Sequence, residues 1–395
     1  MKPAPALPWH RPCPICLADQ PASLHLNAMA PVDGLDLSYR VCRCAQCGFH
    51  YAADLALPET YETYYRNLSK YDVPRMGDFP SPLERLRASA SLDICRPHIP
   101  GNAAVADIGC GRGALLHAFK EAGHDRLYGL DPAPASAASL GLGPVLQGSI
   151  EEAHRLPLGE LDLVCLMGVL EHLPQLREDM NALAAALPKQ ARILIEVPAL
   201  ERFLRPRSEP FGELSLEHVQ YFSKPSLVRL MAALGYEALT TTFVALDGDG
   251  ACDSLFGLFA RADAPMQAAS AETCDTMDAY IAQSRRDLAS ALASLTQAAP
   301  QRFAIYGAGS HSARLLPALE AQGLLERVAF IADGNPNLQG KRLGSFTVVS
   351  PQALDEDSAL PVLISSYRAQ APIAKALQAR HPQRPLLKLY PDDAR

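Results

Sequence analysis

Apolar residues recur in two different patterns along most of this chain. Short apolar runs that end at glycine or polar residues predict buried strands at 103–108, 127–130, 161–167 and 192–197. Apolar residues at helical spacing predict helices near 83–94, 114–122 and 175–187, and a more polar helix near 272–297. Strands and helices that alternate in this way indicate an α/β fold built on a parallel, doubly wound sheet.

A second alternation of strands and helices begins at Arg302, so the 395 residues are expected to fold as several units. The pattern predicts a cysteine-rich module, a connector with one helix, a first α/β domain, a helical linker and a second, Rossmann-like α/β domain. The expected boundaries of these five parts are 9–55, 56–100, 101–265, 266–300 and 301–395.

Composition and charge narrow the range of partners. The chain holds 36 basic and 43 acidic residues, a formal net charge of −7, and no block of Lys and Arg. Since nucleic-acid binding normally needs a concentrated basic face, we expect no nucleic-acid partner. No apolar run reaches the roughly 18 residues of a membrane span. Residues 1–8 lack the features of a signal peptide, so a cytoplasmic protein with no membrane partner is expected.

A glycine-rich turn is the most informative motif of the first α/β domain. Residues 107–113 have the sequence DIGCGRG and lie where a predicted strand ends and a helix begins. Glycines let the backbone turn sharply and let a ligand approach the main chain. The carboxylate of the first residue would repel a pyrophosphate and favour a cation, and S-adenosylmethionine carries a sulfonium and an ammonium. The expected cofactor contacts of this turn are Asp107, Gly109, Cys110, Gly111 and Gly113.

A second carboxylate makes this turn more specific. Asp131 ends the next predicted strand, where it can accept hydrogen bonds from both hydroxyls of a ribose. Two alternatives stay open. One is a tight glycine turn that binds nothing. The other is a dinucleotide site, although the usual GxGxxG spacing is absent here.

Residues 85–200 resemble the class I methyltransferase family. The turn at 107–113 is similar to the first motif of that family, and Asp131 is similar to its ribose-binding acid. The sequence QGSI at 147–150 falls where the family contacts adenine, and LMGVLEH at 166–172 resembles the fourth-strand motif beside the methionine end of the cofactor. The resemblance implies further cofactor contacts from Ser149, Ile150, Met167 and His172.

Two Cys-x-x-Cys pairs near the start of the chain indicate a metal site. Each pair presents two thiolates, and two pairs give the tetrahedral four-thiolate set that suits a structural zinc ion. A module of under 50 residues needs such a cross-link to fold. Cys42 is either an alternative to Cys44 or a buried thiol; the two-residue spacing favours Cys44. The predicted zinc ligands are Cys13, Cys16, Cys44 and Cys47.

The sequence ELSLEHVQYFS at 213–223 contains a candidate catalytic base. It follows the last predicted strand of the first α/β domain and is expected near the open end of the sheet, where such folds bind ligands. Histidine exchanges protons near neutral pH, so His218 is the expected base, with Glu217 or Tyr221 orienting it or polarising a substrate oxygen. The alternative is that these residues only pack beside the cofactor, because a sulfonium is already a strong electrophile.

The whole layout resembles the zinc-containing sugar C-methyltransferase family of deoxysugar biosynthesis. Its zinc cysteines, its Glu-His and Tyr-Phe-Ser segment and the start of its C-terminal domain are matched by the cysteine pairs, by 217–223 and by 302–309. The resemblance implies a nucleotide-linked keto sugar as substrate. It also implies that His218 removes a proton beside the ketone, so that the resulting carbanion takes the methyl group.

Other functions stay open at this level. O- or N-methylation of a sugar or other small molecule would need only a different acceptor atom. The C-terminal turn Gly307-Ala308-Gly309, with Asp333 after the next predicted strand, allows an NAD-dependent oxidoreductase as an alternative of another class. The sequence does not determine the acceptor atom, the substrate, nucleotide binding by the C-terminal domain, or the oligomeric state.

Overall fold

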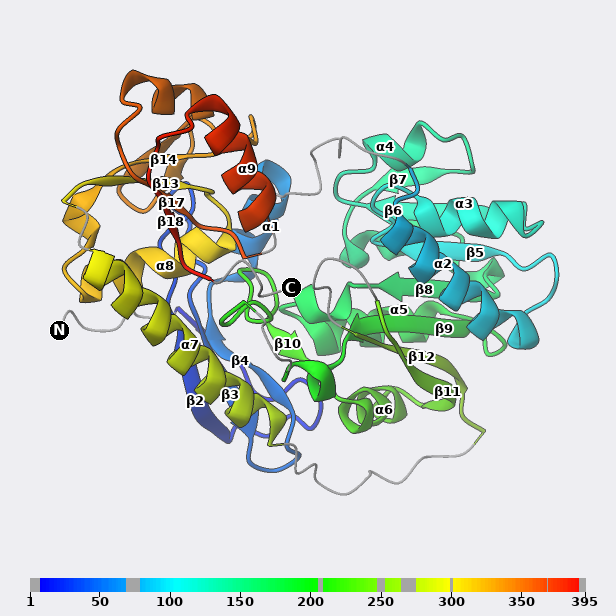
Figure 1. The fold of residues 1–395 in the computed structure, drawn as a ribbon. Coiled ribbons are helices and arrows are strands. Elements are labelled where there is room, and N and C mark those ends of the chain that lie inside the picture. Colours follow the sequence, from blue (N-terminus) through cyan, green and yellow to red (C-terminus); the bar gives the residue numbers. More distant parts are fainter. Residues whose placement is uncertain are drawn as a thin grey trace.

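The computed structural model describes residues 8–68, 79–204, 209–246, 253–263, 275–298, 301–367 and 369–390, and they build three β-sheets with flanking helices (Figure 1). The helix expected at 272–297, within the 266–300 linker, is described from residue 275 and forms α7 (Thr276–Ala298).

The central sheet has seven strands in the order β11-β12-β9-β8-β5-β6-β7. Its parallel strands are β5 (Val105–Ile108), β6 (Leu127–Asp131), β7 (Val145–Gln147), β8 (Leu163–Met167) and β9 (Arg192–Pro198). Four of these five confirm the strands expected from the apolar runs. The antiparallel strands are β11 (Tyr236–Val244) and β12 (Ser254–Arg261).

The expectation of a wholly parallel sheet is wrong at this edge. Strand β12 pairs antiparallel with both β9 and β11. Parallel neighbours need a crossover of about a dozen residues or more, and residues 245–253 are too few to provide one between β11 and β12.

Helices cover both faces of this sheet. On one face, α2 (Pro82–Cys95) and α3 (Ala114–Glu121) pack over Leu163 and Cys165 of β8. On the other face, α5 (Leu176–Ala186) and α6 (Lys224–Ala233) pack over Val164 and Leu166 of the same strand. Successive side chains of a strand point to opposite faces, so β8 contributes to both apolar cores and reads as a continuous apolar run. The short helix α4 (Ala135–Ala138) follows β6.

The connector at 56–100 contains two helices, not the single helix expected. Helix α2 begins at a capping box made by Ser81 and Glu84. Before it lies α1 (Pro58–Leu68), whose sequence PETYETYYRNL is polar and tyrosine-rich and gave no helical signal. Tyr61 and Tyr64 are buried against other parts of the chain, so tertiary packing rather than local pattern stabilises this helix.

The N-terminal sheet contains β1 (Trp9–His10), β2 (Pro21–Asn27), β3 (Tyr39–Cys44) and β4 (His50–Leu55) in the order β1-β4-β3-β2. A fifth strand, β10 (Gln220–Tyr221), comes from the far end of the sequence and pairs with β4. The segment that holds His218 therefore leads directly into the N-terminal sheet.

The C-terminal sheet has six strands in the order β15-β16-β14-β13-β17-β18. Its strands are β13 (Phe303–Tyr306), β14 (Val328–Ala332), β15 (Arg342–Leu343), β16 (Phe346–Val349), β17 (Val362–Ile364) and β18 (Leu386–Lys388). Helices α8 (Ser310–Ala321) and α9 (Gln370–Arg380) flank it. All its pairings except β15–β16 are parallel.

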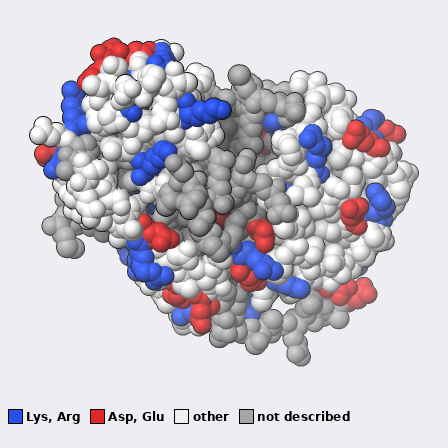
Figure 2. All heavy atoms as spheres, in the orientation of Figure 1, with Lys and Arg blue, Asp and Glu red and all other residues white. Residues whose placement is uncertain are grey.

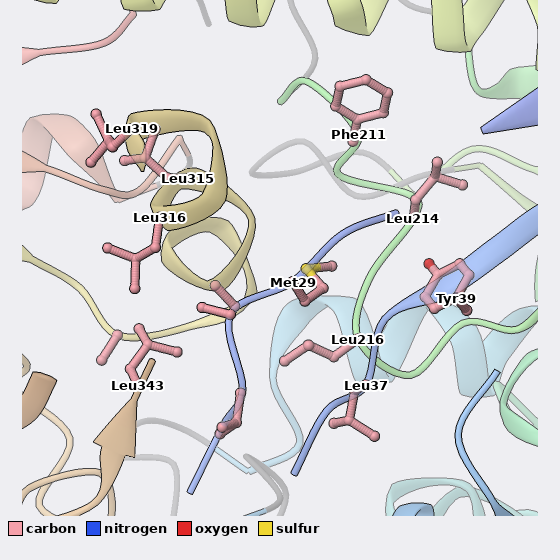
Figure 3. Packing of buried hydrophobic residues seen from close by; sticks show 14 of the residues in the cluster. Met29, Leu37, Tyr39, Phe211, Leu214, Leu216, Leu315, Leu316, Leu319 and Leu343 are labelled. Carbon is pink, nitrogen blue, oxygen red and sulfur yellow. The ribbon is translucent and has the colours of Figure 1, made fainter. Parts of the chain in front are cut away.

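One apolar core joins the N-terminal sheet, helix α7 and the C-terminal sheet (Figure 3). Met29 and Tyr39 lie in it beside Leu214, and Leu315 and Leu316 of α8 complete it. Backbone bonds cross the same boundary, since the Ala30 amide donates to Ala313 at 2.7 Å. The first and last parts of the chain therefore pack as one body.

The described surface carries mixed charge. Figure 2 shows Lys and Arg side chains interspersed with Asp and Glu on the face that it presents. Among the described residues, no helix is long and apolar enough to span a bilayer.

Candidate functional site

A cavity of about 530 Å³ opens at the carboxyl ends of β5, β6 and β8. It brings together ten of the residues predicted from the sequence: Asp107, Gly109, Cys110, Gly111, Asp131, Ser149, Ile150, Met167, His172 and His218. Three other predicted residues, Gly113, Glu217 and Tyr221, do not line it.

The glycine turn has a backbone that other residues adopt with difficulty. Gly109, Gly111 and Gly113 have φ angles of 79°, 51° and 83°. A Cβ on Gly109 would lie 2.6 Å from Val169 Cγ2, whereas a Cβ on Gly111 would meet nothing within 4 Å. Gly109 is thus required for packing, and Gly111 leaves open space on the cavity side. Gly113 ends the turn as the N-cap of α3 and packs on Ala137.

Asp107 presents a buried and unsatisfied carboxylate beside this turn. The residue is 2% exposed, and its Oδ1 atom has no hydrogen-bond partner in the structure. Burial, reinforced by the nearby Asp131, raises the pKa of Asp107 to about 7. A buried acceptor of this kind is costly unless a donor or cation meets it. The ammonium group of an amino acid is such a partner, so the residue fits the methionine end of S-adenosylmethionine.

Asp131 is oriented by the backbone around it. Its Oδ2 accepts the amide of Gly111 at 2.8 Å, and its Oδ1 accepts the amide of Ala133 at 2.8 Å. These two bonds fix the direction in which the carboxylate points. Ser149 and Ile150 follow β7 in the sequence and also line the cavity. An adenine attached to the ribose would lie against them.

Two histidines form the other chemical feature of the cavity. The rings of His172 and His218 are 4.8 Å apart and nearly perpendicular. The Tyr65 hydroxyl and His172 Nδ1 are 3.1 Å apart and hydrogen-bonded. The Nε2 atom of His172 lies 3.9 Å from Glu171 Oε1, and its Nδ1 lies 3.8 Å from Glu217 Oε2. Glu171, His172 and His218 bring their ligand atoms within 4.8 Å of one another, a spacing at which the three could hold a metal ion.

Glu217 and Tyr221 lie behind this pair. Glu217 is buried, and its Oε1 accepts a hydrogen bond from the Tyr64 hydroxyl at 2.9 Å. The Tyr221 hydroxyl is also buried and donates to the carbonyl of His218 at 2.7 Å. Both residues therefore contact the histidines from the protein side rather than from the cavity.

Several cavity residues were missed from the sequence. Glu196 is buried at the end of β9, forms an ion pair with Arg87 of α2 and accepts a hydrogen bond from Ser254 of β12. Glu171 is also buried, and burial together with the charge of Glu196 raises its pKa to about 8. Glu171 lies within the motif at 166–172, but the motif did not distinguish it from its neighbours. Arg87, Glu196 and Ser254 come from three other segments and share no local motif, so the sequence did not indicate that they meet here.

The four predicted zinc cysteines converge in the N-terminal sheet. Cys13 and Cys47 have sulfurs 3.6 Å apart, and the sulfurs of Cys16 and Cys44 are 3.5 Å apart. All four lie within 4.8 Å of one another, close to the separation of about 3.8 Å expected for thiolates around one zinc ion. Cys42 is buried outside this group.

The two knuckles share a backbone conformation. In each, the amide four residues after the first cysteine donates to the carbonyl of that cysteine at 2.9 Å, from Leu17 to Cys13 and from Gly48 to Cys44. The φ angles of Leu17 and Gly48 are 64° and 83°. The donor set fits a structural zinc ion, with thiolates supplied from two turns.

The C-terminal glycine turn repeats the hydrogen bonds of the first turn. Asp333 accepts the amides of Ala308 and Asn335, each at 2.7 Å, as Asp131 accepts those of Gly111 and Ala133. A Cβ on Gly307 would lie 2.8 Å from the Ser365 carbonyl, so the turn packs tightly on β17. A separate cavity of about 290 Å³ in this domain lies beside Tyr306 and Arg380 and is not lined by the glycines.

This fold and site define a class I methyltransferase domain of the Rossmann-like α/β type. Residues 83–241 match the family described as "Methyltransferase domain". Residues 83–241 therefore form a methyltransferase domain.

Two curated proteins illustrate its relatives. "C-methyltransferase NovU" of Streptomyces niveus is 26% identical over 235 residues, which cover 58% of this chain and 53% of that protein. "tRNA U34 carboxymethyltransferase" of Shewanella oneidensis is 33% identical over 112 residues, 24% of this chain and 34% of that protein. The matches thus span about half of the first relative and a third of the second.

Among solved structures, a similar chain is the 1,6-didemethyltoxoflavin-N1-methyltransferase of Burkholderia thailandensis, with S-adenosylhomocysteine bound. It is 21% identical, has a TM-score of 0.43, and the match covers 55% of this chain and 98% of that chain.

Proposed function

We propose that this chain transfers a methyl group from S-adenosylmethionine to a carbon atom of a nucleotide-linked keto sugar. The observation that carries the proposal is that one cavity holds both the Asp107–Asp131 glycine turn and the His172–His218 pair. The first half suits a cationic nucleoside cofactor, and the second half suits proton removal from an acceptor. The similarity to NovU supports carbon as the acceptor atom, and the resemblance to sugar C-methyltransferases supports a sugar as the substrate.

Four residues would bind the three parts of the cofactor. The free Oδ1 of Asp107 would accept the ammonium group, Asp131 would accept the ribose hydroxyls, and Ser149 and Ile150 would line the adenine. When bound, S-adenosylmethionine supplies an electrophilic methyl group on a sulfonium. Every protein group at that end of the cavity then serves to orient this methyl toward the acceptor.

The acceptor half would perform the proton transfer. A ketone acidifies the C–H bond beside it, and His218 takes that proton onto a ring nitrogen. The electron pair of the C–H bond moves into an enolate, whose carbon forms the new C–C bond as the C–S bond breaks. S-adenosylhomocysteine leaves, and the protonated His218 releases its proton to solvent. The reaction is balanced and needs no external oxidant or reductant.

Glu171 and His172 would stabilise the enolate oxygen. Glu171 has a pKa raised to about 8, so it is largely neutral at pH 7 and presents an O–H donor at the cavity wall. His172 lies between Glu171 and Glu217 and lines the same cavity, where a ring N–H can donate to the oxygen. Glu217 and Tyr221 would orient the histidines through the contacts described above.

A structural zinc ion completes the proposal. Cys13, Cys16, Cys44 and Cys47 would hold it in a closed cage with no open position for substrate. Its role would be to fold the N-terminal sheet, which in turn receives β10 beside His218.

The test uses a methyl-labelled cofactor and a panel of nucleotide-linked keto sugars, with NMR location of the label. We expect the label on a carbon next to the ketone. His218→Ala is expected to lower turnover by about 100-fold or more, the contribution typical of a general base, with little change in affinity for S-adenosylhomocysteine. His154→Ala is the matched control, because His154 is exposed and hydrogen-bonded only to the Glu151 carbonyl nearby in sequence.

The outcomes separate the alternatives. Label on oxygen or nitrogen would replace carbon transfer with O- or N-methylation. Undiminished turnover in His218→Ala would remove the base assignment. Transfer to a tRNA fragment but to no sugar would move the substrate class to nucleic acid.

A further inference from the structure

The loop at 209–219 carries the proposed base and has little regular structure of its own. Its conformation therefore depends on contacts with other elements. Phe211 shows this dependence most clearly, because its φ angle of 58° is unfavourable for a bulky residue. Its ring stacks on His25 at 4.6 Å, and its amide donates to the Ser284 hydroxyl at 3.0 Å. Contacts from β2 and α7 thus hold a strained turn in place.

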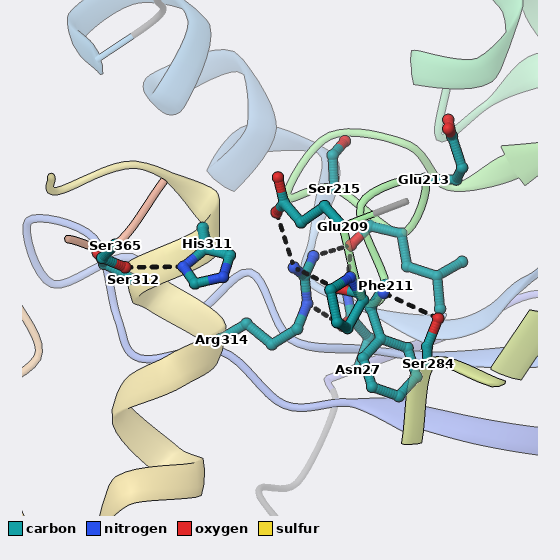
Figure 4. Close-up of polar contacts among 12 residues, drawn as sticks. Asn27, Glu209, Phe211, Glu213, Ser215, Ser284, His311, Ser312, Arg314 and Ser365 are labelled. Atoms are coloured by element: carbon teal, nitrogen blue, oxygen red, sulfur yellow. Dashed lines mark hydrogen bonds and ion pairs between the residues drawn. The ribbon is translucent and has the colours of Figure 1, made fainter. Parts of the chain in front are cut away.

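Arg314 of α8 is the central contact of this loop (Figure 4). The side chain is 8% exposed, and its Nη2 donates to the Leu214 carbonyl at 2.6 Å. Its Nη1 lies 3.5 Å from the Pro210 carbonyl and 3.6 Å from Glu209 Oε1. A buried guanidinium is stable only when its donors are met, so the loop carbonyls and the arginine hold each other in place.

The same carbonyl is fixed from a second side. Asn27 at the end of β2 donates through Nδ2 to the Leu214 carbonyl at 3.0 Å, and its Oδ1 accepts from Arg314 Nε at 3.5 Å. Leu214 itself is buried in the core shared by the first and last parts of the chain. Its position is therefore set by one side chain from the N-terminal sheet and one from the C-terminal unit.

Further hydrogen bonds connect Leu214 to the proposed base. The Tyr39 hydroxyl donates to the Ser215 carbonyl at 2.7 Å. The Ser215 hydroxyl oxygen accepts the amide of Glu217 at 3.2 Å and the amide of His218 at 3.1 Å. Arg314 therefore contacts Leu214 at the start of a turn, and the backbone of His218, four residues later, is hydrogen-bonded within that turn.

We propose that Arg314 is a positioning residue that sets the orientation of His218 in the transfer site. The inference rests on the proposed role of His218 as base. Arg314, Asn27, Tyr39 and Ser284 all lie outside the seven-stranded sheet that holds the cofactor turn. The segment is also bonded to the first α/β domain, since the Val219 amide donates to the Glu171 carbonyl at 2.8 Å, but the Arg314 contacts support the acceptor half alone. A change at Arg314 alters the acceptor half and leaves the cofactor half intact.

The experiment compares Arg314→Met and Arg314→Lys with Arg380→Met. Arg380 is the matched control, because it is an exposed arginine of α9 in the same C-terminal unit and forms an ion pair with Asp355. Hydrogen exchange of residues 209–219, S-adenosylhomocysteine affinity by calorimetry, and kcat and KM are measured for each variant.

We expect Arg314→Met to lower kcat by about 10- to 100-fold, because a displacement of about 1 Å is enough for such a loss. Exchange in 209–219 is expected to rise, with S-adenosylhomocysteine affinity within twofold of the unchanged protein. Arg314→Lys keeps the charge but loses the planar fork, so it should recover part of kcat. Arg380→Met should leave all readouts unchanged.

Three results would overturn the inference: unchanged kcat in a folded Arg314→Met variant, unchanged loop exchange, or a parallel loss of cofactor affinity, which would mean a general structural role. If Arg314→Met does not fold, Arg314→Lys is judged by the same criteria. The exchange readout does not depend on activity. An unaltered enzyme that methylates no sugar carbon would therefore defeat the proposed function without deciding whether Arg314 holds the loop.

Discussion

At the scale of single residues, the site is shaped by buried carboxylates. Asp107, Glu171, Glu196 and Glu217 are all buried, and Arg87 is paired with Glu196. Removing several acidic groups from water favours cations and raises the pKa of those that lack a partner. The sequence indicated Asp107 because it lies in a local glycine motif. It gave no sign of Arg87, Glu196 or Ser254, whose roles depend on contacts between distant segments.

The pKa of Asp107 leads to a prediction about pH. Its carboxylate must be ionised to accept an ammonium group, and burial raises its pKa from 3.8 to about 7. Affinity for S-adenosylhomocysteine should therefore fall as the pH drops from 8 to 6, by up to about tenfold per unit below pH 7. Asp107→Asn should bind more weakly at pH 8 and lose this dependence, as measured by calorimetry.

A control and a stability effect accompany this prediction. Glu171→Gln should keep the pH dependence, since Glu171 lies on the acceptor side; if it alone abolished the dependence, the assignment to Asp107 would be wrong. In the ligand-free protein the folded pKa of Asp107 exceeds the unfolded value of 3.8. This residue therefore lowers the free energy of unfolding as the pH rises from about 4 to about 7, the reverse of a salt-bridged aspartate.

At the scale of elements, the apolar runs of the sequence predicted the buried parallel strands correctly. The expected strands at 103–108, 127–130, 161–167 and 192–197 are confirmed by β5, β6, β8 and β9. The antiparallel edge was missed because the alternation of strands and helices does not continue there. Strands β11 and β12 follow each other with no helix between them among the described residues. Helix α1 was missed because its apolar contacts are tyrosines buried against other segments.

The N-terminal sheet permits a sharp test of the zinc proposal. Cys42 and Cys44 are both buried, lie two residues apart on β3, and differ in whether they belong to the four-sulfur group. Cys44→Ser should lose the single zinc ion and be destabilised by more than about 3 kcal/mol, since loss of a structural metal is among the most destabilising single changes. Cys42→Ser should keep zinc at one per chain.

Elemental analysis and thermal unfolding provide the two measurements. Equal zinc content in both variants, or zinc absent from the unaltered chain, would reject the four-cysteine site. If only Cys42→Ser lost zinc, Cys42 would be the zinc ligand in place of Cys44.

At the scale of the whole molecule, the sequence pattern suggested separate units joined in series, whereas the structure interlocks them. Residues near 29 and 315 share a core, and β10 leaves the methyltransferase domain to pair with β4. Hydrophobic periodicity reports that a face is buried but not which distant element covers it. The contacts that place His218 were therefore beyond prediction from one sequence, although its motif was visible.

This interlocking makes a final prediction about how the molecule opens. Leu316 of α8 lies in the core shared with the N-terminal sheet, and Leu377 of α9 lies in a separate core on the outer part of the C-terminal sheet. Each Leu→Ala change should cost about 2–5 kcal/mol, the usual range for a buried leucine. Only Leu316→Ala should increase hydrogen exchange in residues 21–44, because only Leu316 shares a core with Met29 and Tyr39. Equal exchange of 21–44 in the two variants would mean that the N-terminal sheet is stable without its C-terminal neighbour. In that case the C-terminal unit would act on the loop beside His218 through the direct contacts of Arg314, and not through the stability of the N-terminal sheet.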